Sequence, residues 1–232
     1  MKAIISGASR GIGKACALAL ADAGYDLCLI SRSRKDLDDL KSLIEKENKV
    51  SVKLIALDLT DFERIGSMDW GSLCGSDEKL VLVNNLGVYA KDEASKVSIA
   101  EIEVGLRLNL ASAVALSQNI IPSMKKANAG LIINVNSVNG LHSDQTSASY
   151  SISKHALKGW SDALREELRK SGIKVTSIYP GAVNTSSWDG LSVDRQRMIQ
   201  AEDIAQLIVA IGELSVHALV EEIRIDPMDF SH

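Results

Sequence analysis

Two side chains that could exchange a proton with a substrate, Tyr150 and Lys154, stand four residues apart. They lie near the start of the segment 148–171, which is expected to form one long helix, and on a helix this spacing puts both side chains on the same face. A positive charge within about 4–6 Å favours the phenolate and would lower the pKa of the tyrosine from its usual value of ~10. The pair predicts general acid/base chemistry in a sheltered cleft, although the same spacing also occurs where a lysine simply extends to water.

Three glycines, Gly7, Gly11 and Gly13, follow a predicted first strand over 3–6 and lead into a helix predicted over 12–23. Gly7 and Gly11 permit backbone angles that a Cβ would block, and Gly13 would let the helix pack tightly on the strand. The backbone N–H groups at the start of such a helix attract anions, so the turn suits a pyrophosphate. The spacing G-x-x-x-G-x-G differs from the usual dinucleotide fingerprint, and a simple tight turn is the alternative.

Arginines rather than carboxylates follow the second predicted strand, 27–31. Arg32 and Arg34 stand where a dinucleotide site that holds a free ribose 2′-hydroxyl would place an acidic residue, and Arg10 lies in the glycine turn. An arginine at this position accommodates a 2′-phosphate. The three arginines are therefore expected to converge on one ribose pocket, which favours NADP(H) over NAD(H). The alternative is that they are solvated at the end of the strand.

Further strands are predicted over 52–57, 80–83, 131–136, 174–179 and 221–226, with helices over 36–48, 99–126 and 201–214. This alternation predicts one α/β domain over residues 1–232. It would be a three-layer, Rossmann-type, doubly wound parallel sheet of seven strands with helices on both faces. Asp58, the Asn84-Asn85 pair and Ser137 follow three of these strands, and ligands of such sheets bind outside the carboxyl ends of the strands. Asp58 is expected to contact the cofactor and Asp61 to cap the next helix, while the segment around 184–200 could form a substrate lid.

The composition excludes several classes of partner. The chain of 232 residues has a net charge of −4 and no strongly basic patch, so neither nucleic acid nor a membrane surface is an expected partner. No apolar run is long enough to span a membrane, and the amino-terminal residues do not resemble a signal peptide, so a cytoplasmic location is expected. The three cysteines are scattered and odd in number, which predicts neither a disulfide framework nor a zinc site.

Across almost its whole length the chain resembles the short-chain dehydrogenase/reductase family. The resemblance is carried, in order, by Gly7 to Gly13, Asn84-Asn85-Leu86-Gly87, Asn109, Ser137, Tyr150 with Lys154, and Pro180-Gly181 through Thr185. Leu86 replaces the alanine that is usual in this family and adds bulk beside the expected cleft. Ser6 stands where the family often has threonine.

The resemblance implies a role for each catalytic candidate. Tyr150 would be the general acid in carbonyl reduction or the base in alcohol oxidation, and Lys154 would lower its pKa and hold the nicotinamide ribose. Ser137 would bind the substrate oxygen, and Asn109 would support a water-linked proton path to Lys154. The expected NADP(H) contacts are Gly7, Ser9, Arg10, Gly11, Ile12, Gly13, Arg32, Asp58, Leu59, Asn85, Gly87, Tyr150, Lys154, Pro180, Gly181, Val183 and Thr185. No metal is expected.

The expected substrate is a small carbonyl compound or secondary alcohol, bounded by Tyr89, Leu141, His142, Val183 and Trp188. Assembly as a homodimer or homotetramer is also expected, with small residues on two helices, Ala111, Ala113, Ala148 and Ala156, and with Trp160 at the contact. Two alternatives use the same scaffold without catalysis. One is a regulatory protein that binds NADP, and the other is a structural protein that binds no cofactor.

Overall fold

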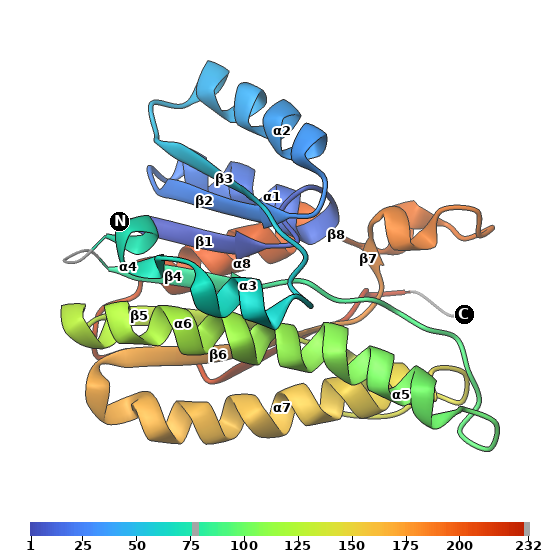
Figure 1. Ribbon diagram of the computed structural model, residues 1–232. Helices are drawn as coiled ribbons and strands as arrows, with labels where there is room; N and C mark the ends of the chain where they lie inside the picture. Colours follow the sequence, from blue (N-terminus) through green and yellow to red (C-terminus); the bar gives the residue numbers. More distant parts are fainter. Residues whose placement is uncertain (76–78, 230–232) are drawn as a thin grey trace.

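The computed structural model describes residues 1–75 and 79–229, apart from the side chain of Cys74. A seven-stranded parallel sheet lies at its centre, with helices on both faces (Figure 1), which confirms the predicted Rossmann-type architecture. The strands of this sheet are β1 (Lys2–Ser6), β2 (Asp26–Ser31), β3 (Val52–Ala56), β4 (Leu80–Asn84), β5 (Gly130–Val135), β6 (Ile173–Pro180) and β9 (Glu222–Ile225). The helices are α1 (Gly11–Asp22), α2 (Arg34–Glu47), α3 (Phe62–Ser67), α4 (Trp70–Cys74), α5 (Ile99–Leu106), α6 (Ser112–Ala127), α7 (Ala148–Leu168) and α8 (Ala201–Glu213).

The strands run in the order β3-β2-β1-β4-β5-β6-β9, and every neighbouring pair is parallel. The direction in which successive strands are added reverses beside β1, where Ile4 pairs with Cys28 of β2 on one side and with Leu82 of β4 on the other. In open sheets of this kind, ligands bind at the carboxyl edge beside such a reversal. The topology therefore places the glycine turn after β1 and the Asn85 turn after β4 next to each other.

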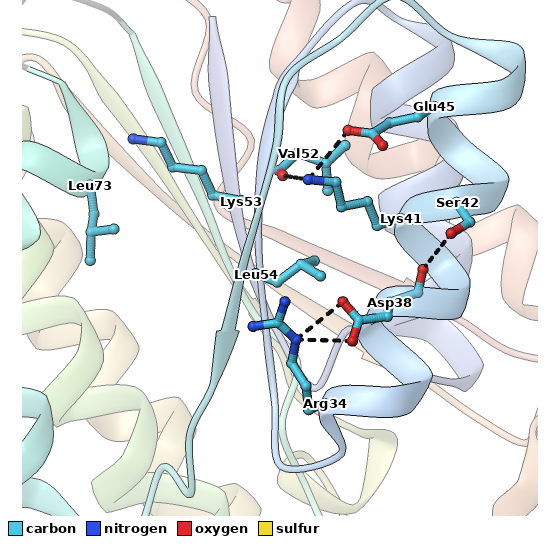
Figure 2. Close-up of a pocket in the computed structure, with 9 residues that line it drawn as sticks. All are labelled: Arg34, Asp38, Lys41, Ser42, Glu45, Val52, Lys53, Leu54 and Leu73. Atoms are coloured by element: carbon cyan, nitrogen blue, oxygen red, sulfur yellow. Dashed lines mark hydrogen bonds and ion pairs between the residues drawn. The ribbon is translucent and has the colours of Figure 1, made fainter.

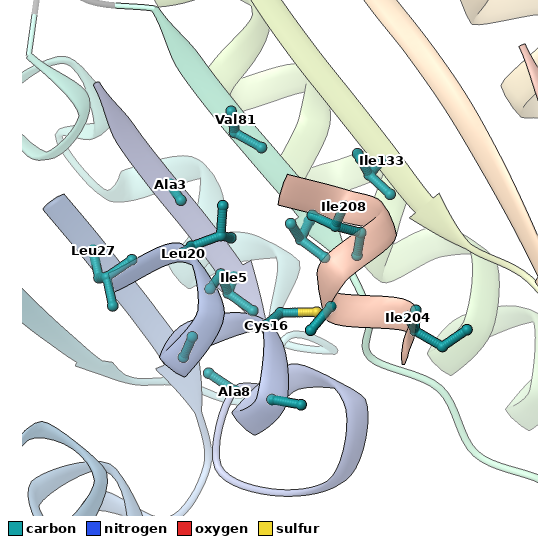
Figure 3. Close-up of a cluster of buried hydrophobic side chains, with 14 of the residues drawn as sticks. Ala3, Ile5, Ala8, Cys16, Leu20, Leu27, Val81, Ile133, Ile204 and Ile208 are labelled. Carbon is teal, nitrogen blue, oxygen red and sulfur yellow. The ribbon is translucent and has the colours of Figure 1, made fainter. Parts of the chain in front are cut away.

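Alternation along the strands divides the apolar side chains between two cores, as expected for buried parallel strands. Ala3 and Ile5 of β1 pack with residues of α1, α2 and α8, including Leu20 and Ile208 (Figure 3). Ile4, between them in sequence, packs with residues of α3, α4, α6 and α7 on the opposite face. The two cores hold both helical layers against the sheet, so that the strand ends form a fixed edge.

The region predicted as one helix over 99–126 contains a break in its helical pattern. A π-helical turn, Arg107–Ala111, separates α5 from α6. Such turns are rare and occur frequently at functional sites. This one contains Asn109, which is buried, although its neighbours Leu108 and Leu110 are only partly buried.

The segment 184–200 is more ordered than its sequence predicted. Its base is a two-stranded parallel ladder between β7 (Val183–Asn184) and β8 (Ile199–Gln200), reinforced by a hydrogen bond from the Asn184 amide to Gln200 at 2.9 Å. Between these strands lie two short 3₁₀ turns, Ser186–Trp188 and Arg195–Arg197. Figure 1 shows this segment projecting beyond the carboxyl edge of the sheet. Among the described helices, none is long and apolar enough to cross a lipid bilayer.

Candidate active site

The glycine turn after β1 has the backbone geometry that its sequence predicts. Gly7 and Gly11 have φ values of 62° and 53°, a region that side chains with a Cβ rarely adopt. A Cβ on Gly13 would lie 2.2 Å from the carbonyl oxygen of Gly7, so α1 approaches the turn too closely for any larger residue. The turn and the first residues of α1 therefore form one compact unit.

The start of α1 fits an anionic ligand. Its N-cap residue, Arg10, makes no side-chain capping hydrogen bond, and the first turn contains no acidic residue. The first backbone N–H groups of a helix have no partner within the helix, and the helix dipole favours a negative charge there. A pyrophosphate matches these donors. Ser9 is half-buried in the same turn, and Ile12 packs against the core beneath it.

Hydrogen bonds tie the turn after β4 to the glycine turn. The Asn85 amide donates to the carbonyl oxygens of Ser6 and Gly7 at 3.2 and 3.3 Å, and the hydroxyl of Ser6 accepts from the backbone of Asn85 and Leu86. Asn85 thus braces the two loops, and its amide hydrogens are used within the protein. The side chain of Leu86 packs against the second core cluster, so its extra bulk is accommodated by packing.

The segment after β6 reaches the glycine turn through Thr185. A Cβ on Gly11 would lie 3.2 Å from the Thr185 methyl group, so these two expected cofactor contacts are neighbours. Val183 is buried in β7, close in sequence to Thr185. Pro180 and Gly181 are involved in the sheet instead: Pro180 pairs with Ile225, and the Gly181 N–H donates to the Ile225 carbonyl at 2.8 Å.

Ser137, Tyr150 and Lys154 come together at the end of β5 and the start of α7. The hydroxyl of the largely buried Ser137 lies near the Tyr150 phenol and acts to lower its pKa. Lys154 Nζ lies 5.7 Å from the centroid of the Tyr150 ring. The ring of Tyr89 meets that of Tyr150 edge-on, with centroids 5.2 Å apart and planes at 65°. A phenol, a hydroxyl and an ammonium group therefore share one partly open site.

The pKa of Tyr150 differs in direction from the sequence-based expectation. Burial raises it, the nearby Ser137 hydroxyl acts in the opposite sense, and the proximity of Tyr89 and Asp144 raises it further. The net pKa is therefore raised and not lowered as the spacing of Tyr150 and Lys154 led us to expect. Loss of solvent disfavours the phenolate more than the lysine, held 5.7 Å from the ring, can favour it. The Tyr150 phenol therefore keeps its proton at pH 7.

Lys154 is deeply buried, with 3% of its surface exposed, and it donates to the carbonyl oxygen of Val135 at 3.0 Å. Burial lowers the pKa of Lys154 to about 8. A Cβ on Gly87 would lie 3.4 Å from Lys154 Nζ and 3.5 Å from Asn109 Oδ1, so both polar groups flank this glycine. The ammonium of Lys154 and the side-chain oxygen of Asn109 therefore both lie beside Gly87.

Asn109 is held by both backbone groups of Val88. Its Oδ1 accepts from the Val88 N–H at 2.7 Å, and its Nδ2 donates to the Val88 carbonyl at 3.0 Å and to Ser153 Oγ at 2.8 Å. The asparagine expected to be functional is therefore buried and bonded. It fixes the chain after Gly87 against α7.

Asp58 and Arg32, two of the expected cofactor contacts, lie just after the ends of β3 and β2. The exposed Asp58 carboxylate accepts from the backbone N–H and the hydroxyl of Thr60, which lower its pKa, and Arg32 contributes to this effect. Leu59 is buried in the second core cluster, so its side chain faces away from any ligand. Asp61 caps α3 by accepting from the Arg64 N–H at 3.0 Å, as predicted.

The expected convergence of three arginines is incomplete, because Arg34 belongs to α2. Its Nε contacts both carboxylate oxygens of Asp38, at 3.1 and 3.0 Å, one helical turn along. Figure 2 shows Arg34 in an open pocket between α2 and the edge strand β3, where Lys41 is likewise paired with Glu45. Residues four apart on a helix are neighbours, so α2 brings Asp38 beside Arg34. Arg34 makes this ion pair instead of a contact across the strand ends. Of the three arginines, Arg10 and Arg32 remain candidates for binding a 2′-phosphate.

Several residues around the site were not predicted from the sequence. The Asn139 N–H donates to Ser137 Oγ at 3.2 Å, and its amide donates to Asp144 at 2.6 Å and to Ser147 at 2.8 Å. Asp92, 57 residues before Ser149, accepts from the backbone of Ser149 at 3.0 Å. Asp144 sits just ahead of α7 and could have been identified as a turn or capping residue. Asp92 gives no local signal, because its partner is distant in sequence.

Known proteins are similar to this chain over nearly its full length. A family model for short chain dehydrogenases matches residues 1–196. An uncharacterized oxidoreductase of Staphylococcus epidermidis is 27% identical over 226 residues, covering 97% of this chain and 96% of the relative. An alcohol dehydrogenase from the archaeon Thermococcus sibiricus, solved with 5-hydroxy-NADP, is 25% identical with a TM-score of 0.89, covering 97% of this chain and 96% of that one.

A more distant structure supports the fold alone. L-sorbose reductase from Gluconobacter frateurii, solved with NADPH and L-sorbose, is 23% identical with a TM-score of 0.87, covering 97% of this chain and 94% of that one. The sheet order, the glycine turn and the family match over 196 of 232 residues agree with one another. This chain therefore belongs to the short-chain dehydrogenase family and is an oxidoreductase of that family.

Proposed function

We propose that this protein is an NADP(H)-dependent oxidoreductase that transfers a hydride between the nicotinamide and a carbonyl or secondary alcohol, with Tyr150 as the general acid or base. The observation that carries the proposal is the Tyr150 phenol, which lies near the Ser137 hydroxyl and has the buried Lys154 ammonium 5.7 Å from its ring. A phenol with a raised pKa keeps its proton until a stronger base forms. The oxygen of a carbonyl becomes such a base as it is reduced.

Each side chain has a separate task. Tyr150 gives its proton to the substrate oxygen, and Ser137 donates a hydrogen bond that holds this oxygen in reach. Lys154 stabilises the tyrosine after it has lost the proton. Asn109 supports a water-linked path through Lys154 by which Tyr150 regains its proton from solvent. The bound nicotinamide supplies or accepts the hydride, so the protein contributes orientation and proton transfer.

The cofactor is NADP(H). The turn from Gly7 to Gly13 and the uncapped start of α1 suit its pyrophosphate, and Arg32 and Arg10 supply cations for a 2′-phosphate. The structure of the Thermococcus sibiricus relative with 5-hydroxy-NADP supports this assignment. Thr185 and Val183 lie at the nicotinamide end, and the segment 184–200 with Trp188 covers the substrate.

The protein acts as a homodimer or homotetramer in the cytoplasm, in this proposal. Ala113 and Ala148 are buried within one chain and cannot supply the predicted helix contact. The other predicted contact residues, Ala111, Ala156 and Trp160, are half-buried and stay candidates. The exposed apolar residues Val104, at 56%, and Ile152, at 42%, join them.

A substrate panel tests the proposed function. Purified protein is expected to oxidise NADPH, followed by absorbance, with at least one member of a broad set of ketones and aldehydes. Saturating NADP should also raise the melting temperature, because a ligand that binds only the native state stabilises it. NADP stabilisation with no turnover across the panel would favour a regulatory NADP-binding protein. The absence of both effects would leave only a structural role.

Arg32→Asp tests the choice of cofactor. We expect it to raise the Kd for NADPH roughly 10- to 100-fold, since a charge-assisted hydrogen bond contributes about 1.5–3 kcal/mol, and to leave the Kd for NADH nearly unchanged. Fluorescence titration with both nucleotides measures the difference. Arg34→Asp is the matched control, because Arg34 is paired with Asp38. Equal weakening of NADPH and NADH by Arg32→Asp would contradict the placement of the 2′-phosphate.

A further inference from the structure

Residues 85–98 connect β4 to α5 and form no helix or strand apart from a one-residue bridge between Asp92 and Ser147. The position of this segment therefore depends on individual contacts. Three of them involve active-site elements: Val88 binds the Asn109 side chain, Tyr89 meets the Tyr150 ring, and Asp92 binds the first turn of α7. The segment 88–92 forms a wall beside the catalytic tyrosine.

Asp92 makes the most extensive of these contacts. Its carboxylate accepts from the Ser149 N–H at 3.0 Å and from the Ser149 hydroxyl, while its own N–H donates to the Thr146 carbonyl at 2.9 Å. Its carbonyl accepts from the Ala148 N–H at 3.4 Å. Two of the N–H groups that begin α7 thus find their partners in a residue more than fifty positions upstream in sequence.

The helix itself lacks the usual means of satisfying these groups. Its N-cap residue, Ser147, makes no side-chain capping bond, and its first turn contains no acidic residue. Helix starts favour a carboxylate acceptor, both for the hydrogen bond and for the charge. The Asp92 carboxylate is such an acceptor and comes from outside the helix. It binds Ser149, the residue directly before Tyr150. The contact that caps the catalytic helix therefore also holds the segment that carries Tyr89.

We propose that Asp92 is a positioning residue, which clamps the 88–92 wall to the first turn of α7. The clamp fixes the position of the Tyr150 phenol and of the Tyr89 ring, which faces the substrate. The inference rests on the proposed oxidoreductase function for its effect on turnover. Tyr89 is 51% exposed and suits contact with an apolar or aromatic group of the substrate.

Turnover of three variants tests the clamp. Asp92→Ala is expected to lower kcat by roughly 10- to 100-fold at saturating NADPH, because small displacements of a catalytic group have effects of this size. Its Kd for NADPH should stay at the wild-type value, since the cofactor side is not touched. Asp92→Asn should remain close to wild type, because an amide can bond both the N–H and the hydroxyl of Ser149. Asp69→Ala is the matched control: Asp69 binds the N–H and hydroxyl of Ser72 in the same way, but it caps α4, which leads to the amino edge of the sheet.

Hydrogen exchange tests the clamp without any turnover. In Asp92→Ala, the amides of Ser149 and of residues 88–92 should exchange faster, while those of the glycine turn and α1 keep their wild-type rates. Unchanged exchange at Ser149 would overturn the proposal. So would equal loss of kcat in the Ala and Asn variants, or a Kd for NADPH that rises in step with the loss of kcat. A wild-type protein without reductase activity would refute the proposed function, and the exchange rates would still decide on the clamp.

Discussion

Tyr150→Phe is expected to lower kcat for carbonyl reduction roughly 10³-fold while leaving the Kd for NADPH nearly unchanged. The variant removes only the phenolic oxygen, which is the proton donor, and acid catalysis of this kind contributes about 10²–10⁴-fold. The ring would keep its edge-on contact with Tyr89, 5.2 Å between centroids, so the wall beside the site should stay in place. Stopped-flow absorbance of NADPH measures kcat, and fluorescence titration measures the Kd.

Tyr25→Phe provides the control for this experiment. The hydroxyl of Tyr25 is buried and has no hydrogen-bond partner among the described residues, so its removal should affect neither activity nor cofactor binding. A Tyr150→Phe variant that keeps its kcat within a few-fold of wild type would rule out the phenol as the proton donor. A large increase in the Kd for NADPH would instead show that Tyr150 acts mainly in binding.

Lys154→Met is expected to combine a large loss of activity with a gain in stability. The loss of kcat should be roughly 10²- to 10³-fold, because the tyrosine loses the ammonium that stabilises its deprotonated form. The stability effect follows from the pKa of Lys154, which burial lowers from 10.5 to about 8. Below pH 8 the lysine is charged in both the folded and the unfolded chain, and keeping that charge buried costs about 3 kcal/mol.

This cost defines the pH window of the measurement. Between pH 8 and 10.5 the folded protein has released the proton while the unfolded chain still holds it, so the cost falls as the pH rises. Methionine avoids the buried charge but loses the hydrogen bond to Val135, which offsets about 1 kcal/mol. The free energy of unfolding, measured with urea, should therefore be about 2 kcal/mol higher than wild type at pH 7, and the difference should shrink toward pH 10.

Lys158→Met is a matched control with the opposite expected sign. Burial disfavours the charge of Lys158, but hydrogen bonds to Glu222 and Asp162 at 2.6 and 2.9 Å outweigh it and raise its pKa. Its removal should destabilise the protein and leave the catalytic groups in place. A Lys154→Met variant that is less stable than wild type at pH 7 would show that the buried ammonium is a net stabilising group.

Most of the fold could be predicted from the sequence because its signals are local. Most strands of the large sheet are short, largely apolar runs followed by turn residues, and the glycines of the first turn have positions that only glycine tolerates. The same locality explains the confirmed cap at Asp61, which bonds to a residue three positions later. The helix capped by Asp61, α3, was predicted without bounds, and α4 was not predicted, because five or six residues give too little periodicity.

The site was less predictable where contacts link distant segments or where burial changes a charge. Arg34 pairs with Asp38 on its own helix. The number of arginines after the strand therefore gave too high a count of the cations available to a ribose phosphate. The direction of the Tyr150 pKa depends on how deeply the phenol is buried, which spacing along a helix does not reveal. The Asp92 contact joins residues 57 positions apart, and only the fold brings them together.

The π-helical turn around Asn109 has a consequence for the register of the chain. A wide turn holds one residue more than an α-helical turn, which shifts the two flanking helices by about 100° relative to a continuous helix. The shift lets Gly105 of α5 lie against α7, where a Cβ would be 3.3 Å from the Ser149 carbonyl, while Leu116 and Ile120 of α6 still pack in the second core. A homologue with one residue fewer here could form a continuous helix. Either its core-facing side chains or its buried asparagine would then point away from the position that it has in this protein. We therefore expect a homologue that keeps this asparagine geometry to keep the length of the segment 99–127 as well.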